Sequence, residues 1–338
     1  MPTTLVTGAT GFVAGHVIEE LLAHGHRVRG TVRSLHDPER VAHLRALAAR
    51  TGGSLELVEA DLLDDAGWAD AVAGCEYVLH VASPFPATMP RDPRELERTA
   101  VDGTLRVLRA SAEAGVRRVV TTSSVAAVSA GRPRGETRVR DESDWGDPEL
   151  APPYPRSKIL AERAAWRFAG EHPEVELTVI NPGMVLGPIR HAAAGTSVDT
   201  VRRLLNGDLP AVPRLGFCPV DVRDVARAQR LALETPHAAG KRYVCAGDNL
   251  WFGDMARMLA EEFGPRGHRV PTRHMPYAML WAASRFDANL RLALTFAGRP
   301  ELVSARRAHE DLGWTMRPIR ETLADTGDSL IAHGLVTR

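Results

Sequence analysis

Residues 7–14, Thr7-Gly8-Ala9-Thr10-Gly11-Phe12-Val13-Ala14, are the stretch that decides the fold of this 338-residue chain. They follow a short β-rich run, residues 4–7, and open a pattern that predicts a helix over residues 11–24. Glycine permits the sharp turn from strand to helix and leaves room for a pyrophosphate at the helix N-terminus. The stretch therefore predicts the opening strand, loop and helix of a dinucleotide-binding domain.

Short β-rich runs and helical patterns alternate after this loop. Strands are expected at 27–32, 55–58, 77–81, 118–122 and 177–180, and helices at 38–50, 94–114 and 154–170. Such alternation predicts a Rossmann-type, doubly wound parallel α/β sheet with right-handed crossovers. Beyond residue 188 the chain becomes more helical, although 221–233 reads as a helix and 241–245 as a further strand.

We therefore expect two structural parts. Residues 1–187 and 216–247 would form the dinucleotide-binding domain, and residues 188–215 and 248–338 a smaller, helix-rich substrate-binding lobe. The chain is long enough for one large α/β domain with such a lobe.

The end of the second strand bears on the choice of dinucleotide. A carboxylate for the ribose hydroxyls is usual there in NAD-binding domains, whereas this strand ends in Arg33, with no acid before Asp37. A guanidinium at Arg33 suits a 2′-phosphate, which favours NADP(H). After the third strand, Asp61 and Leu62 are candidates for the adenine, and an equal alternative for Asp61 is the N-cap of a helix in the run after Leu62.

The segment Tyr154-Pro155-Arg156-Ser157-Lys158 places a phenol and an ammonium one helical turn apart. A phenol can supply the proton that a carbonyl oxygen needs on reduction, and a neighbouring ammonium would lower its pKa toward the working range. A hydroxyl to polarise the carbonyl is available in residues 121–124, Thr-Thr-Ser-Ser, at the carboxyl end of the fifth strand.

The overall composition excludes several classes of protein. Basic and acidic residues balance at 42 each, so nothing in the net charge favours nucleic acid or an anionic membrane as a partner. We find no apolar run long enough to span a bilayer, no signal-peptide pattern and no metal-ligand spacing. Three scattered cysteines are typical of a reducing compartment, so the expected location is the cytoplasm.

Five motifs together resemble a known family. They are TGATGFVA at 7–14, LHVASP at 79–84, VVTTSSVAAV at 119–128, YPRSK at 154–158 and INPGMVLGP at 180–188. The combination resembles the extended short-chain dehydrogenases/reductases, within the branch of dihydroflavonol reductases, cinnamoyl-CoA reductases and yeast methylglyoxal/aldehyde reductases. The resemblance covers residues 3–247, and the last 90 residues are not diagnostic.

The resemblance implies a catalytic trio of Ser124, Tyr154 and Lys158, with Ser123 as the alternative serine. It also implies a set of contacts to NADP(H). These are Thr7, Gly8, Thr10, Gly11, Phe12, Val13, Arg33, Asp61, Leu62, Val81, Ala82, Ser83, Thr122, Tyr154, Lys158, Pro182, Gly183, Val185 and Ser197. For Ser197 a loop or helix N-cap role is an equal alternative.

Some residues depart from the branch. Asp102 stands where asparagine is usual, which puts any relay through that amide in doubt, and Ser129 stands about where plant dihydroflavonol reductases have an asparagine. The cysteine-containing signature of plant cinnamoyl-CoA reductases is missing before Lys158. These departures disfavour both plant activities, while Ala14 and residues 125–128, Val-Ala-Ala-Val, suggest a closer likeness to the yeast-type enzymes.

The expected function is NADPH-dependent reduction of an aldehyde or ketone to its alcohol, acting on an apolar or aromatic small molecule, as a monomer or homodimer. An NAD-dependent nucleotide-sugar epimerase and a non-catalytic NADP(H) sensor are the alternatives. Candidates for the substrate pocket are apolar side chains: Phe85, Met89, Met184, Phe217 and Trp251.

Overall fold

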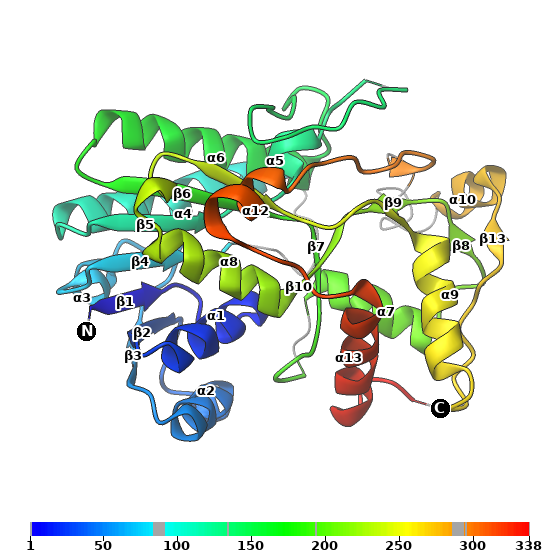
Figure 1. The fold of residues 1–338 in the computed structure, drawn as a ribbon, viewed down its shortest axis with the longest axis horizontal. Helices are drawn as coiled ribbons and strands as arrows, with labels where there is room; N and C mark the ends of the chain where they lie inside the picture. Colours follow the sequence, from blue (N-terminus) through cyan, green and yellow to red (C-terminus); the bar gives the residue numbers. More distant parts are fainter. Residues whose placement is uncertain are drawn as a thin grey trace.

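The computed structural model describes residues 2–83, 92–133, 135–192, 195–285, 294 and 296–337. Its centre is a seven-stranded parallel sheet with the order β11-β6-β5-β4-β1-β2-β3 (Figure 1). The strands are β1 (Thr3–Val6), β2 (Arg27–Val32), β3 (Leu55–Glu59), β4 (Tyr77–His80), β5 (Arg118–Thr122), β6 (Glu176–Pro182) and β11 (Arg242–Cys245). The strand order reverses between β1 and β4, and ligands of such sheets bind at the carboxyl edge at this point.

Helices cover both faces of this sheet (Figure 1). One face carries α1 (Phe12–Ala23), α2 (Pro38–Thr51) and α8 (Val222–Glu234), and the other carries α3 (Trp68–Val72), α4 (Pro93–Glu113) and α6 (Pro153–Glu171). Buried side chains such as Leu21 and Val225 fill the first layer, and Leu108 and Phe168 fill the second. Because both faces are covered, most residues of the central strands β1, β4, β5, β6 and β11 are buried.

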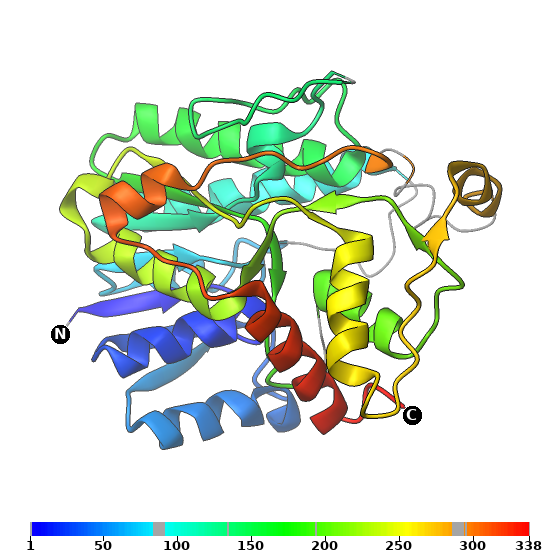
Figure 2. The same ribbon diagram turned by 45° about the vertical axis from the view of Figure 1, so that its right-hand side comes forward.

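A second group of elements lies beyond the carboxyl ends of the strands (Figure 2). It contains the short strand pairs β7 (Met184–Leu186) with β10 (Pro219–Asp221), β8 (Val212–Pro213) with β13 (His274–Met275), and β9 (Gly216–Phe217) with β12 (Leu250–Trp251). Its helices are α7 (Thr196–Leu205), α9 (Phe252–Phe263), α10 (Tyr277–Ala283) and α13 (Ile319–Ala332). Leu204, Met255 and Phe263 belong to its own hydrophobic core.

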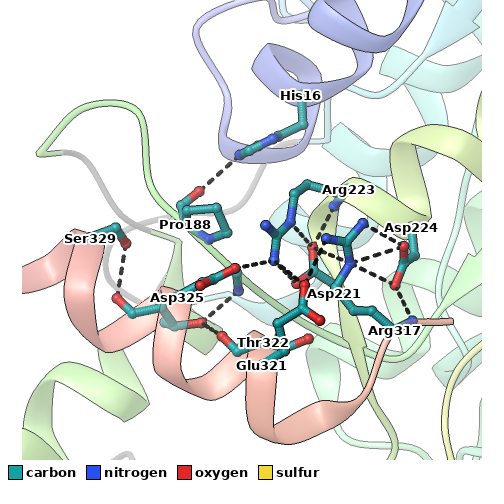
Figure 3. Close-up of polar contacts among 12 residues, drawn as sticks. His16, Pro188, Asp221, Arg223, Asp224, Arg317, Glu321, Thr322, Asp325 and Ser329 are labelled. Atoms are coloured by element: carbon teal, nitrogen blue, oxygen red, sulfur yellow. Dashed lines mark hydrogen bonds and ion pairs between the residues drawn. The ribbon is translucent and has the colours of Figure 1, made fainter.

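A cluster of ion pairs around two buried aspartates joins α13 to α8 (Figure 3). Asp221 is fully buried and accepts from Arg223 at 2.8 Å, and Arg223 also pairs with Asp325 of α13 at 2.6 Å. Arg317 binds Asp224 at 2.9 Å. Burial favours the neutral acid, but the hydrogen bonds and charge of Arg223 hold the pKa of Asp221 below its usual value. Charged groups thus fasten α13 to the start of α8.

The expected parallel, doubly wound sheet is confirmed, and its predicted strands and helices lie within two residues of their observed ends. The sequence reading missed α3 and α5 (Ala126–Ser129), which are too short for a helical period to be visible. The proposed division into domain and lobe stays a prediction. The helix α12 (Arg306–Leu312) falls within residues 248–338, which were expected to belong to the substrate-binding lobe, but it packs beside α8 and β11 on the main sheet. Within the described part of the chain, no helix is long and apolar enough to cross a membrane.

Candidate active site

The glycine loop between β1 and α1 lies at the carboxyl edge of the sheet. Gly8 has a φ of +67°, and a Cβ there would lie 2.9 Å from the Cβ of Ala82 on the neighbouring strand end. Gly11 is exposed and begins α1 without a side-chain cap, so the N–H groups at the helix start, at Phe12 and Val13, have no capping side chain. This is the arrangement that a pyrophosphate needs, and the loop therefore fits a dinucleotide.

Thr7 and Thr10 both form hydrogen bonds with other residues of the protein. The buried hydroxyl of Thr7 accepts from the N–H groups of Val81 at 3.1 Å and Ala82 at 2.9 Å, and lies 3.0 Å from Nδ1 of His80. With both acceptor positions used, Thr7 donates its own proton to His80, whose neutral ring then carries its proton on Nε2. This clamp holds residues 81–83 against the glycine loop. The carbonyl of Thr10 accepts from His191 at 2.9 Å.

Arg33 and the pair of Asp61 and Leu62 were expected to contact the adenosine half of the dinucleotide, and their surroundings differ. Arg33 is exposed at the end of β2 and forms no hydrogen bond or ion pair with the described residues, so its guanidinium can bind an added anion. Asp61 accepts from the N–H of Leu63 at 3.0 Å within a turn, and it caps no helix, because the next helix, α3, begins at Trp68 with Gly67 as its N-cap. Leu62 is half-buried and packs against α4, where a Cβ on Gly103 would lie 3.3 Å from its own Cβ.

Tyr154 and Lys158 lie in the first turns of α6, and the ammonium lies 6.0 Å from the centroid of the phenol ring. Lys158 is buried and donates to the hydroxyl of Ser83 at 2.9 Å. Burial lowers the pKa of Lys158 to about 8, although the charge of Glu162 acts against this, and burial raises the pKa of Tyr154 to about 12. The expected lowering of the phenol pKa is therefore not seen, because desolvation acts on Tyr154 while the ammonium donates to Ser83.

Three hydroxyl groups follow one another at the end of β5 and do not share one environment. Thr122 binds Gln229 of α8, on the face of the sheet away from α6. Ser123 is buried, and its hydroxyl has no partner among the described residues. Ser124 is half-buried, and its oxygen accepts from the N–H of Ala126 at 3.2 Å. The proton of Ser124 therefore remains available to a substrate oxygen.

The segment after β6 is tightly packed. A Cβ on Gly183 would lie 1.9 Å from the carbonyl oxygen of Cys218, so glycine is required at this position. The resemblance implies that backbone groups of this segment meet the nicotinamide carboxamide, but the N–H groups of Gly183 and Met184 already donate to the carbonyls of Cys245 and Cys218, at 3.1 and 2.8 Å. The carbonyl of Pro182 accepts from the N–H of Val125 at 2.9 Å and thereby joins this segment to the turn that carries Ser123 and Ser124.

The other predicted residues lie around this edge. Val185 is half-buried in β7, and Ser197 is half-buried in the first turn of α7, whose N-cap is Gly195. Asp102 is exposed on α4. Among the pocket candidates, Met184, Phe217 and Trp251 are half-buried, and Phe85 and Met89 lie outside the described residues.

Sequence reasoning missed two features of the site. The first is the clamp between Thr7 and His80, and the second is a buried polar cluster of Glu162, Asn181 and Arg242 behind α6. Glu162 follows Lys158 by one helical turn, and Asn181 belongs to the quoted INPG motif. Their residue types and spacing were visible, but their contacts join positions far apart in the chain.

Comparison with known proteins agrees with the geometry. The model of the NAD dependent epimerase/dehydratase family matches residues 4–246. Cinnamoyl-CoA reductase 1 of Petunia hybrida is 41% identical over 333 residues, which is 97% of this chain and 92% of that protein. Anthocyanidin reductase of Vitis vinifera is 33% identical over 286 residues, covering 80% of this chain and 83% of that one.

Solved structures give the same picture. Yeast methylglyoxal/isovaleraldehyde reductase Gre2, complexed with NADPH, superimposes with a TM-score of 0.78 at 26% identity, covering 99% of this chain and 100% of that chain. Vestitone reductase from alfalfa gives a TM-score of 0.77 at 26% identity, with the same coverage. Identity to the petunia enzyme thus exceeds identity to the yeast enzyme, the reverse of what Ala14 and residues 125–128 suggested.

The fold and the site define a nicotinamide-dinucleotide-dependent oxidoreductase. The chain belongs to the NAD dependent epimerase/dehydratase family, the extended short-chain dehydrogenases/reductases, as its motifs predicted.

Proposed function

We propose that the protein uses NADPH to reduce an aldehyde or ketone to the alcohol, with Tyr154 as proton donor, Lys158 as its cationic partner and Ser124 as the group that polarises the carbonyl. The observation that carries the proposal is the placement of a buried ammonium 6.0 Å from a phenol ring on one helix at the carboxyl edge of the sheet. The similarity to named reductases supports it.

Each member of the trio has a definite chemical state at neutral pH. Tyr154, with its pKa raised to about 12 by burial, holds its proton, and a phenol of this pKa still protonates the stronger base that forms on a reduced carbonyl oxygen. Lys158, with a pKa of about 8, is a cation below that pH and stabilises negative charge on the phenol oxygen. The hydroxyl of Ser124 can donate to the carbonyl oxygen.

Residues of the glycine loop and Arg33 would hold the dinucleotide. When bound, its reduced nicotinamide supplies the hydride to the carbonyl carbon. The uncapped start of α1 suits the pyrophosphate, and the exposed guanidinium of Arg33 suits a 2′-phosphate through charge-assisted hydrogen bonds. These features favour NADPH over NADH.

The test is the rate of NADPH oxidation with a panel of aromatic and aliphatic aldehydes and ketones. Cinnamoyl-CoA belongs in the panel, because the petunia relative is named for it. Tyr154→Phe should lower the turnover number by a factor of about 10² or more, while NADPH binding persists. Tyr77→Phe is the matched control, because Tyr77 lies at the amino end of β4, at the far end of the strands from the proposed site. This variant should keep wild-type turnover. Equal rates for wild type and Tyr154→Phe would refute the assigned roles.

The two alternatives give different results in the same preparation. An epimerase would retain NAD through purification and would convert a nucleotide sugar without net oxidation. A sensor would bind NADPH and reduce no carbonyl in the panel. The intact pair of Tyr154 and Lys158 favours catalysis over sensing.

A further inference from the structure

Three buried polar side chains meet behind the proposed active site. Glu162 of α6, Asn181 of β6 and Arg242 of β11 are 2%, 0% and 6% exposed. Removing charges from water is costly unless hydrogen bonds compensate, so such a cluster requires a physical reason.

The cluster is closely bonded around the carboxylate of Glu162. Nε of Arg242 donates to Oε1 at 2.5 Å, and Nδ2 of Asn181 donates to Oε2 at 2.7 Å. Arg242 is itself fixed, since it donates to the carbonyls of Glu142 at 3.0 Å and Asp144 at 2.7 Å. The carboxylate therefore has little freedom to move.

The same cluster contacts the turn that carries Ser124 and lies on the helix that carries Tyr154 and Lys158. Nδ2 of Asn181 also donates to the backbone carbonyl of Ser124, at 3.1 Å. Glu162 follows Lys158 by one helical turn and Tyr154 by two turns on α6. One amide thus joins the turn that carries the serine to the helix that carries the phenol and the ammonium.

Stability alone does not explain the cluster. Nη2 of Arg242 and Oδ1 of Asn181 are buried and have no hydrogen-bond partner in the described part of the chain. A buried network with unsatisfied atoms is less stable than apolar packing of the same volume. What the cluster does provide is a fixed distance between Ser124 and α6.

We infer that Glu162 is a positioning residue, which acts through Asn181 to hold Ser124 in register with Tyr154 and Lys158 and places a fixed negative charge behind the ammonium. This inference rests on the proposed function. The guanidinium of Arg242 would hold the carboxylate of Glu162 in place and compensate part of its negative charge.

The surroundings of Lys158 make the electrostatic part testable. The titratable groups that face it are Tyr154 and Glu162 on α6 and His80 on β4. His80 is neutral, because burial and then the charge of Lys158 lower its pKa to about 3. Arg242 lies behind Glu162. The carboxylate of Glu162 is thus the only negative charge that these groups bring to the ammonium.

The first arm of the experiment is kinetic. Asn181→Ala should lower the turnover number of the intact enzyme about tenfold or more, since small displacements of reacting groups cost this much, with little change in the KM for NADPH. Arg118→Met is the matched control. Arg118 is 2% exposed, binds Glu176 at 2.8 Å and lies at the other end of β5, so its loss should cost stability and spare turnover.

The second arm needs no turnover. The chain has only two lysines, so protein labelled with ¹³C-lysine gives two side-chain signals, and Lys241→Arg assigns them. The midpoint for Lys158, followed by NMR against pH, should fall by about one unit in Glu162→Gln. Arg118→Met should leave it unchanged.

The inference is supported if Asn181→Ala loses turnover and Glu162→Gln lowers the Lys158 midpoint, while Arg118→Met changes neither. It is overturned if either variant behaves like the control. Should the wild-type protein reduce no carbonyl, the proposed function fails by itself, and the NMR titration alone then decides whether Glu162 acts on Lys158.

Discussion

Replacing Lys158 by methionine should make the protein more stable and inactive. The side chain of Lys158 is buried, and its pKa is lowered from 10.5 to about 8. Between these two pH values the folded protein binds fewer protons than the unfolded chain, so stability rises with pH across this window. Below pH 8 the wild type carries the full penalty of the buried cation, about 3 kcal/mol.

Methionine fills a similar volume without a charge. The lost hydrogen bond to Ser83 offsets about 1 kcal/mol, so Lys158→Met should gain about 2 kcal/mol at pH 7. The gain should disappear by pH 10.5, where the unfolded chain also loses its proton. Urea unfolding followed by tryptophan fluorescence at both pH values measures the difference, and the NADPH assay should show no turnover.

Lys241→Met is the control, because it removes the only other lysine. The Lys241 side chain is 38% exposed and pairs with Asp311 at 2.7 Å, so its loss should change stability by less than about 1 kcal/mol and preserve turnover. Two results would show that burial of the ammonium is not what lowers its pKa. One is a Lys158→Met protein that is no more stable than wild type at pH 7, and the other is a stability difference that is the same at pH 7 and pH 10.5.

Three further changes probe other parts of the structure. Gly8→Ala places a Cβ at a φ of +67° and should weaken NADPH binding about tenfold in a fluorescence titration, whereas Gly253→Ala, with open space around it, should not. Arg33→Ser should raise the Kd for NADPH about tenfold and leave that for NADH unchanged; equal effects on both would exclude a 2′-phosphate contact. Arg317→Met, which removes a partner from two buried aspartates, should cost about 2 kcal/mol in urea unfolding. The exposed Arg320→Met should cost less than about 1 kcal/mol, and a loss no larger for Arg317→Met would mean that the ion pairs with Asp221 and Asp224 do not stabilise the fold.

The local parts of the site could be predicted from the sequence. The glycine loop, the strand ends and the pair of Tyr154 and Lys158 each depend on residues within one turn or one helix. The observed φ of Gly8, +67°, agrees with that reading. Short elements such as α5 could not be predicted, because four residues do not show a period.

The chemical state of the site could not be predicted in the same way. Tyr154 was expected to have a lowered pKa, and burial raises it instead. The Lys158–Glu162 spacing is typical of an exposed ion pair, yet both side chains are buried, and the carboxylate binds Arg242, 80 residues away. Desolvation depends on every element packed around a group, which spacing along the chain does not report.

The sequence by itself determined the order of strands and helices, the dinucleotide loop and the identity of the phenol–ammonium pair, because local backbone preferences and hydrophobic periodicity act over a few residues. Only the tertiary structure decided that Thr7 clamps His80 and that Asn181 ties Ser124 to α6. It also decided that Arg223 and Arg317 fasten α13 to the sheet. These contacts join residues brought together by packing, and the free energy of a buried polar group is set by that packing.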